Sequence, residues 1–103
     1  MWGMTIPRST SISNGVEFQN KNIVIGEHVF INRNCCLYTV GKNIADDCIT
    51  IGRGCWIGIG AVILSGFTNN KGCIIGAGSV VNKDCEANCL YAGNPARLKR
   101  RLI

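Results

Sequence analysis

The sequence contains one histidine, two prolines and no long apolar run, and these shortages exclude several classes of protein. A single histidine and the absence of any CxxC pair leave too few ligands for a zinc site. Apolar runs such as AVIL, residues 61–64, are far too short to cross a membrane, and the N-terminal MWGMTIPRSTS lacks the apolar segment of a signal peptide. We therefore expect a cytoplasmic protein without a metal ion and without a membrane partner.

Positive charge is concentrated near the C-terminus. The net charge is +5, and the segment RLKRR, residues 97–101, holds four of the 11 basic residues. Such a segment can bind a phosphorylated small molecule or a nucleic acid, or it can remain solvated. Aromatic side chains are not interleaved with these basic residues, which disfavours stacking on single-stranded nucleic acid. We expect no nucleic-acid partner.

A period of six residues runs through the chain from Ile51. The successive blocks read IGRGCW, IGIGAV, ILSGFT, NNKGCI, IGAGSV and VNKDCE. A six-residue period is typical of a parallel β-helix, in which each block forms one short strand and a turn. Alternate residues of a strand face the same side, so the fifth residue of one block and the first of the next should point inward together. The expected inward pairs are Cys55 with Ile57, Ala61 with Ile63, Cys73 with Ile75, and Ser79 with Val81.

The repeat also accounts for most of the seven cysteines. A free cysteine packs as a small apolar residue, which suits the fifth place of a block. Four cysteines occupy that place: Cys35, Cys55, Cys73 and Cys85. The spacing assigns no task to the other three, Cys36, Cys48 and Cys89.

The glycines follow the same period and do not form a nucleotide-binding loop. They take the second and fourth places of the blocks, where the chain must turn a corner. A dinucleotide fingerprint requires a helix after its glycines, and no helical period follows GIGAV or GAGSV.

Three blocks close one triangular coil of 18 residues, which places Ile57 over Ile75. Upstream the six-residue repeat returns from Ile25 in a register that differs by two residues, and the shift lies between Leu37 and Ile51.

We predict one all-β domain, a parallel β-helix of about four to five coils over residues 1–103. It comprises an irregular first coil at 1–22, with Val16 and Phe18 as an inward pair, regular coils at 23–92 and a basic exit segment at 93–103. Because such a stack has two open ends, we expect a symmetric assembly, with a trimer favoured by the three-sided shape.

From Ile49 to Arg100 the sequence resembles the hexapeptide-repeat acyltransferases, in particular the maltose, galactoside and polysaccharide O-acetyltransferases. The stretches ITIGRGCWIGIGAVILSG, IIGAGSVVNKD and LYAGNPARLKR carry the resemblance, and IGEHVFINRNC matches more loosely. The resemblance implies a left-handed coil and a homotrimer. It also implies transfer of an acetyl group from acetyl-CoA to a hydroxyl or amine of a small sugar-like or polysaccharide acceptor.

The same resemblance implies the positions of the cofactor contacts. They map onto Ile59, Ala77, Asn82, Lys83, Arg97 and Arg100. Backbone groups at the first two positions would hold the pantetheine amides, and the basic side chains would hold phosphates. Without the resemblance, the same residues would be ordinary coil positions and solvated charges.

Two departures from the family pattern concern asparagines. Asn82 stands where family members usually have threonine. Asn69 and Asn70 stand where the family has an Ile-Gly pair. An unpaired buried amide costs about 1 to 3 kcal/mol, so we expect Asn69 to face solvent or to stack on polar groups.

The family's catalytic histidine is missing. Leu37-Tyr38-Thr39 resembles the lead-in to the catalytic loop, yet Val40-Gly41-Lys42-Asn43 follows without a histidine. In a second alignment FINRNC corresponds to a stretch one coil earlier, which makes Asn34 the acceptor-binding residue and removes a whole coil. His28, the only histidine, is the candidate general base, although its corner position also suits a surface residue. Asp46 and Asp47 are alternative weak bases whose setting is more typical of a surface turn.

Two hypotheses from different classes follow. The first is an acyl-CoA-dependent O-acetyltransferase that uses an unusual base. The second is a catalytically silent trimeric β-helix, either a scaffold or a CoA-binding relative that has lost the histidine loop. A hexapeptide-repeat carbonic anhydrase would need three histidines for zinc, and a sugar nucleotidyltransferase would need a further domain.

Overall fold

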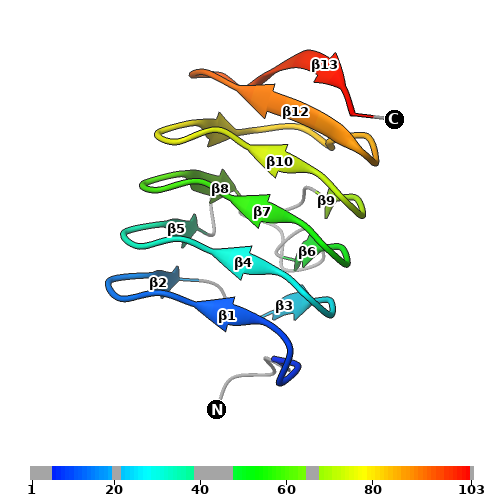
Figure 1. The fold of residues 1–103 in the computed structure, drawn as a ribbon. Coiled ribbons are helices and arrows are strands. Elements are labelled where there is room, and N and C mark those ends of the chain that lie inside the picture. Colours follow the sequence, from blue (N-terminus) through cyan, green and yellow to red (C-terminus); the bar gives the residue numbers. More distant parts are fainter. Residues whose placement is uncertain (1–5, 20–21, 39–47, 65–67, 103) are drawn as a thin grey trace.

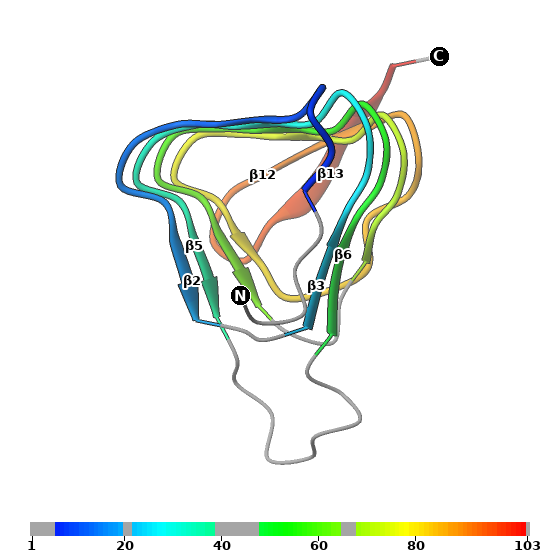
Figure 2. The same cartoon turned by 90° about the horizontal axis from the view of Figure 1, so that it is seen from below.

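The chain is a triangular β-helix (Figure 1). The computed structural model describes residues 6–19, 22–38, 48–64 and 68–102, and within these ranges it contains strands and no helix that could span a membrane. Seen from the N-terminal end, the chain runs counterclockwise as it recedes, so the coil is left-handed (Figure 2). The predicted left-handed parallel β-helix is therefore confirmed.

Three sheets form the three faces of the prism. The first sheet contains β1 (Ser11–Ile12), β4 (Phe30–Ile31), β7 (Trp56–Ile57), β10 (Ile74–Ile75), β12 (Cys89–Ala92) and β13 (Arg97–Arg101). The second contains β2 (Glu17–Gln19), β5 (Cys36–Tyr38), β8 (Val62–Leu64) and β11 (Val80–Val81). The third contains β3 (Asn22–Ile25), β6 (Cys48–Ile51) and β9 (Thr68–Asn69). All pairs are parallel except β12 with β13, so the basic exit segment folds back antiparallel on the last coil.

The stack contains four coils and the start of a fifth, as the period predicts. The fourth coil closes through a parallel bridge between Asn69 and Cys85, and β12 begins the next turn. The first coil is regular from Ser11, which pairs with Phe30, although we expected irregular structure over residues 1–22. Phe18 pairs with Leu37, and Val16 and Phe18 pack against the core as expected. These pairs are 19 residues apart, one more than the 18-residue coil, and this extra residue hides the repeat in the sequence.

The break in the rhythm between Leu37 and Ile51 is larger than the sequence pattern indicates. Leu37 pairs with Ile63 and Ile51 pairs with Asn69, so the corner between β5 and β6 holds eight more residues than the next one. Six of these eight residues equal one full six-residue block, so they do not change the register of the repeat. Only the other two residues appear in the sequence, as the register shift of two. Residues 39–47, with Asp46 and Asp47, lie outside the described residues.

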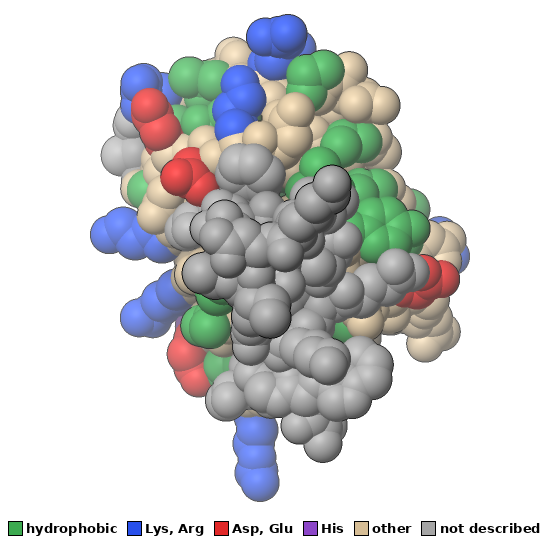
Figure 3. All heavy atoms as spheres, turned by 180° about the vertical axis from the view of Figure 1, so that it is seen from behind, with side chains coloured by type: hydrophobic (Ala, Val, Ile, Leu, Met, Phe, Trp, Pro, Cys, Tyr) green, Lys and Arg blue, Asp and Glu red, His purple; other side chains and the backbone are tan. Residues whose placement is uncertain are grey.

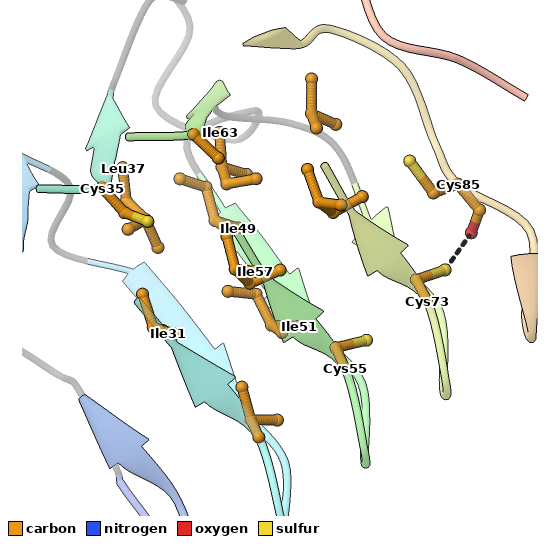
Figure 4. Packing of buried hydrophobic residues seen from close by; sticks show 14 of the residues in the cluster. Ile31, Cys35, Leu37, Ile49, Ile51, Cys55, Ile57, Ile63, Cys73 and Cys85 are labelled. Atoms are coloured by element: carbon orange, nitrogen blue, oxygen red, sulfur yellow. Dashed lines mark hydrogen bonds between the residues drawn. The ribbon is translucent and has the colours of Figure 1, made fainter. Parts of the chain in front are cut away.

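The interior is built from the predicted inward pairs. Ile57, Ile63, Ile75 and Val81 are completely buried, each with its smaller partner two residues earlier. Branched side chains on successive coils stack in columns, as the labelled isoleucines in Figure 4 show. Each buried branched side chain contributes roughly 1.5 to 3 kcal/mol of transfer free energy, which is the main stabilising term.

Cysteines fill the narrow corners of this interior. Cys35, Cys55, Cys73 and Cys85 are at most 1% exposed, and all the cysteines in the described residues are free thiols. The thiol of Cys55 donates to the Asn70 carbonyl oxygen at 2.9 Å, and that of Cys73 to the Glu86 carbonyl oxygen at 2.8 Å. A longer contact joins Cys73 to the Cys85 carbonyl at 3.8 Å (Figure 4). The predicted packing role of these cysteines is confirmed, and the same environment also buries Cys89.

Burial of the thiols predicts a loss of stability at high pH. Desolvation, reinforced by the charge of Cys73, raises the pKa of Cys85 from 9.0 to about 12. The hydrogen bond to Cys55, together with burial, also raises the pKa of Cys73. Since the unfolded thiols ionise first, their contribution is present below pH 9 and is lost as the pH rises towards 12.

Urea denaturation under reducing conditions, repeated between pH 8 and pH 11, measures this dependence. We expect the free energy of unfolding to fall with pH, and Cys85→Ala to make the fall shallower by about one proton. An unchanged slope in Cys85→Ala would show that this thiol does not control alkaline unfolding.

Asn69 contradicts the expectation of an exposed or partnered side chain. Its side chain is 0% exposed, and neither amide atom has a hydrogen-bond partner. Parallel pairing places Asn69 directly between Ile51 and Cys85, and both neighbours point inward. The register of the coil therefore forces the amide into the core, whatever its polarity.

Candidate functional site

Two of the predicted cofactor contacts stand one above the other on one edge of the prism. This edge, here named the Ile59 edge, joins the first and second sheets. Ile59 is 43% exposed, and Ala77 on the next coil is also exposed. The Gly78 amide donates to the Ile59 carbonyl oxygen at 2.8 Å, which fixes the two turns in register. Their backbone groups can therefore contact one extended ligand that runs along the helix axis.

The Ile59 edge continues into the turn after the last coil. The Val80 amide donates to the Gly93 carbonyl oxygen at 3.0 Å, and the Ala96 amide donates to the Val80 carbonyl oxygen at 2.8 Å. These bonds hold the turn against β11 and direct the chain into β13. Arg97 opens β13 opposite Ala92, so this residue lies at the C-terminal end of the edge.

The remaining candidates, Asn82, Lys83 and Arg100, lie on the fourth coil and on β13. Asn82 and Lys83 follow β11 and are exposed, and Arg100 lies in β13 opposite Leu90. In Figure 3, blue side chains lie at the top of the molecule, and others are scattered along its left side and at its bottom. Arg101 forms an ion pair with Glu86 at 2.9 Å. Of the predicted phosphate contacts, the structure places Arg97 on the Ile59 edge above Ala77, whereas Lys83 lies beyond β11, on the edge between the second and third sheets.

Asn34 lies on the Ile59 edge, on the coil below Ile59. The neighbouring Arg33 carbonyl oxygen accepts a hydrogen bond from Gly60 at 3.0 Å, which places Asn34 under Gly60. Asn34 is exposed and has a φ of 63°, a left-handed conformation that asparagine tolerates better than most residues. The turn alone accounts for asparagine here, and the Asn34 side-chain oxygen lies against Gly15 on the coil below, away from Ile59.

His28 lies on a different edge of the prism, between the third and first sheets. It is exposed in the turn between β3 and β4, with a φ of 57°, and its amide donates to the Ser9 hydroxyl at 3.0 Å. Gly54 and Gly72 occupy the same left-handed turn position on the coils above it. The width of the first sheet separates His28 from Ile59, so one chain does not bring the imidazole to the predicted cofactor contacts.

Two outward-facing groups were not singled out from the sequence. Phe30 and Trp56 are 39% and 45% exposed on the first sheet, with ring centroids 6.3 Å apart. On the second sheet, the Cys36 thiol donates to Glu17 Oε2 at 4.0 Å, and a hydrogen bond with Cys36 raises the pKa of Tyr38. Each group lies at the outward position between inward residues, so alternation along the strand is the signal that identifies them.

No group of three or more His, Cys, Asp or Glu residues in the described part of the chain is arranged to hold a metal ion.

Fold, inward pairs and the basic C-terminal end define a hexapeptide-repeat protein with a left-handed β-helix. No family model matches the sequence. The Saccharomyces cerevisiae protein named "Putative acetyltransferase YJL218W" is 36% identical over 99 residues, covering 86% of this chain and 50% of the yeast protein. The chain therefore spans about half the length of this relative.

Solved structures of acetyltransferases share the fold. The polySia specific acetyltransferase NeuO superposes with a TM-score of 0.81 at 32% identity, over 91% of this chain and 50% of that chain. Serine acetyltransferase from Brucella abortus strain S19, solved in complex with coenzyme A, superposes with a TM-score of 0.73 at 30% identity, over 87% of this chain and 39% of that chain. These similarities confirm the resemblance to the hexapeptide-repeat acyltransferases.

Proposed function

We propose that this chain binds acetyl-CoA and transfers its acetyl group to a hydroxyl or amine of a small sugar-like or polysaccharide acceptor. The observation that carries the proposal is the line formed by Ile59, Ala77 and Arg97 along one edge. This line offers backbone groups for an extended pantetheine and cations for phosphates at its C-terminal end. The names of the relatives support acetyl transfer, and one of them was solved with coenzyme A.

We further propose that the working form is a homotrimer in which the cofactor lies between neighbouring subunits. The exposed pair of Phe30 and Trp56 supports association, because large aromatic side chains are favoured at subunit interfaces. Analytical ultracentrifugation with and without acetyl-CoA tests the trimer. A monomer at concentrations that saturate the cofactor site would contradict it.

Substitution of the basic residues tests the cofactor site. A charge-assisted hydrogen bond contributes about 1.5 to 3 kcal/mol, so Lys83→Ala or Arg97→Ala should weaken acetyl-CoA binding by about 10-fold or more. Isothermal titration calorimetry measures the change. Lys71→Ala is the matched control, because Lys71 is equally exposed but stands on the edge that carries His28. Equal losses in all three variants would show a nonspecific charge effect and contradict the assignment.

The role of His28 is tested by turnover. Thiol release from acetyl-CoA is followed with hydroxyl acceptors for the unaltered chain and for His28→Ala. Because His28 and the Ile59 edge do not meet within one chain, we expect His28→Ala to retain most of the rate. A loss of about 10²-fold to 10⁴-fold would instead assign the general base to His28 from a neighbouring subunit.

A catalytically silent scaffold is the second candidate function. The observation in its favour is that the one histidine of the chain stands away from the predicted cofactor contacts. Such a protein would bind acetyl-CoA but release no thiol above the rate of spontaneous hydrolysis with any acceptor. Acceptor-dependent release above that rate would exclude the scaffold.

A further inference from the structure

The last strand of the first sheet leaves one of its backbone edges without a partner. β13 lies at the top of Figure 1 and ends the sheet, and only its edge towards β12 is paired within the described residues. With five residues it is the longest strand in the described part of the chain, and all five side chains are exposed. An edge strand offers unpaired N–H and C=O groups with which another extended chain can pair.

The neighbouring edge at this end of the coil is already covered by the turn after β12. The Val80 amide on β11 donates to the Gly93 carbonyl oxygen, and the Val80 carbonyl oxygen accepts from the Ala96 amide. Among the described residues β13 has no such cover. The bond beside it, from the Leu102 amide to the Asn88 carbonyl oxygen at 2.8 Å, continues the pairing towards β12. β13 is therefore the strand at this end to which a further strand can be added.

The charge of β13 determines which kind of chain can pair there. Four of its five residues are basic, and Arg101 alone among them forms a salt bridge within the described residues, with Glu86. A second copy of this strand would place cations opposite cations, and like charges directly opposite each other destabilise a strand pair. Lysine on an edge strand protects against such self-pairing. The same cations attract an acidic segment, so the charge favours an acidic partner over a second copy.

The exposed leucines add an apolar component to this edge. Leu98 is 43% exposed and Leu102 is 37% exposed. Directly opposite residues of a strand pair share a face, so Leu98 lies on the face of Tyr91, and Arg100 lies on the face of Leu90. An added strand would therefore meet apolar and basic side chains together. Aromatic side chains are absent from β13, so the strand lacks the stacking surface that single-stranded nucleic acids use.

We propose that β13 is a docking strand for an extended acidic segment of a partner protein, which adds to the first sheet as a further strand. Backbone hydrogen bonds along the free edge supply affinity, and the side chains supply specificity. Acidic side chains of the partner contact Lys99 and its basic neighbours, and an apolar side chain contacts Leu98. The docking strand goes beyond the proposed acetyl transfer and requires no acetyl-CoA.

Binding of a synthetic peptide to the full chain tests this proposal. The probe is a short fluorescein-labelled peptide in which glutamate and valine alternate, and fluorescence anisotropy in the absence of acetyl-CoA measures its Kd. We expect Lys99→Glu to weaken binding by about 10-fold or more, because it replaces an attractive charge with a repulsive one. Lys99→Arg should retain binding. Lys71→Glu is the matched control, because Lys71 is an exposed lysine on the edge that carries His28.

A second probe separates strand addition from attraction between charges. The same peptide with every backbone amide N-methylated keeps the charge and cannot donate hydrogen bonds to the edge, so we expect it not to bind. Hydrogen exchange followed by mass spectrometry should show that the unmodified peptide slows exchange in Arg97–Arg101 and not in β1, the terminal strand at the other end of the sheet.

Four outcomes would overturn the docking strand. They are no binding of the unmodified peptide, equal binding of the N-methylated peptide, an equal loss in Lys71→Glu, and tighter binding of a single-stranded oligonucleotide than of the peptide. The last outcome would assign the basic strand to nucleic acid instead. Circular dichroism of each variant confirms that the fold is retained. Binding of acetyl-CoA is measured separately, so the loss of this inference leaves the proposed function intact.

Discussion

Gly58→Ala should be the most damaging single-methyl change in the described part of the coil. A Cβ at Gly58 would lie 2.6 Å from the Ala77 nitrogen and 2.7 Å from the Ile75 carbonyl oxygen. These are backbone atoms of the next coil, so the clash is relieved only by separating two hydrogen-bonded coils. We expect a loss of about 3 kcal/mol or more in the free energy of unfolding. That is a large share of the total stability of a small domain.

Gly54→Ala is the matched control for this prediction. A Cβ at Gly54 would meet nothing within 4 Å, but the backbone φ of +73° is unfavourable for alanine and costs about 1 to 2 kcal/mol. Urea denaturation of both variants, with the exposed surface monitored by the m-value, measures the two losses. If Gly58→Ala loses no more than Gly54→Ala, close coil-to-coil contact is not what selects glycine at residue 58.

Asn69→Val should stabilise the protein. The Asn69 amide is fully buried without a hydrogen-bond partner, and the cost of such an amide is about 1 to 3 kcal/mol. Valine removes the polar group, suits a strand, and continues the column above Ile51. We expect the free energy of unfolding to rise by about 2 kcal/mol, measured by urea denaturation with an unchanged m-value.

Asn70 provides the contrasting control, because it is adjacent and chemically identical. Its side-chain amide donates to the Cys85 carbonyl oxygen at 2.7 Å. Asn70→Ala should therefore destabilise the protein by about 1 kcal/mol. A destabilised Asn69→Val variant would show that the buried amide has a partner in solution, and it would contradict the prediction.

Most of the fold follows from the short-range pattern of the sequence. Inward residues recur every six positions from Ile51, and the side-chain alternation of a strand places each of them in the core. The pattern is less informative where coils differ in length. The first coil has one residue more than 18, so its repeat is not recognisable in the sequence. Between Leu37 and Ile51 the additional residues include a full block of six, which does not change the register of the repeat. Periodicity reports position within a block and not the number of blocks at a corner.

The site was less predictable than the fold because it depends on neighbours from different coils. Resemblance to relatives identified Ile59, Ala77 and Arg97 individually, and their alignment along one edge needed the coil-to-coil register. Cys36 showed no pattern in the sequence, because its partner Glu17 is 19 residues earlier. Residues this far apart in the sequence become neighbours only when the strands pair.

By itself, the sequence determined that this protein is a triangular stack of hexapeptide blocks with small residues at its corners and positive charge at one end. Alternation and period are local properties, and each strand expresses them independently of the others. Only the tertiary structure decided that Asn69 is buried without a partner, that His28 stands on a different edge from Ile59, and that Cys36 meets Glu17. These relations depend on which coil lies above which, and parallel pairing sets that order through backbone hydrogen bonds that do not depend on side-chain chemistry.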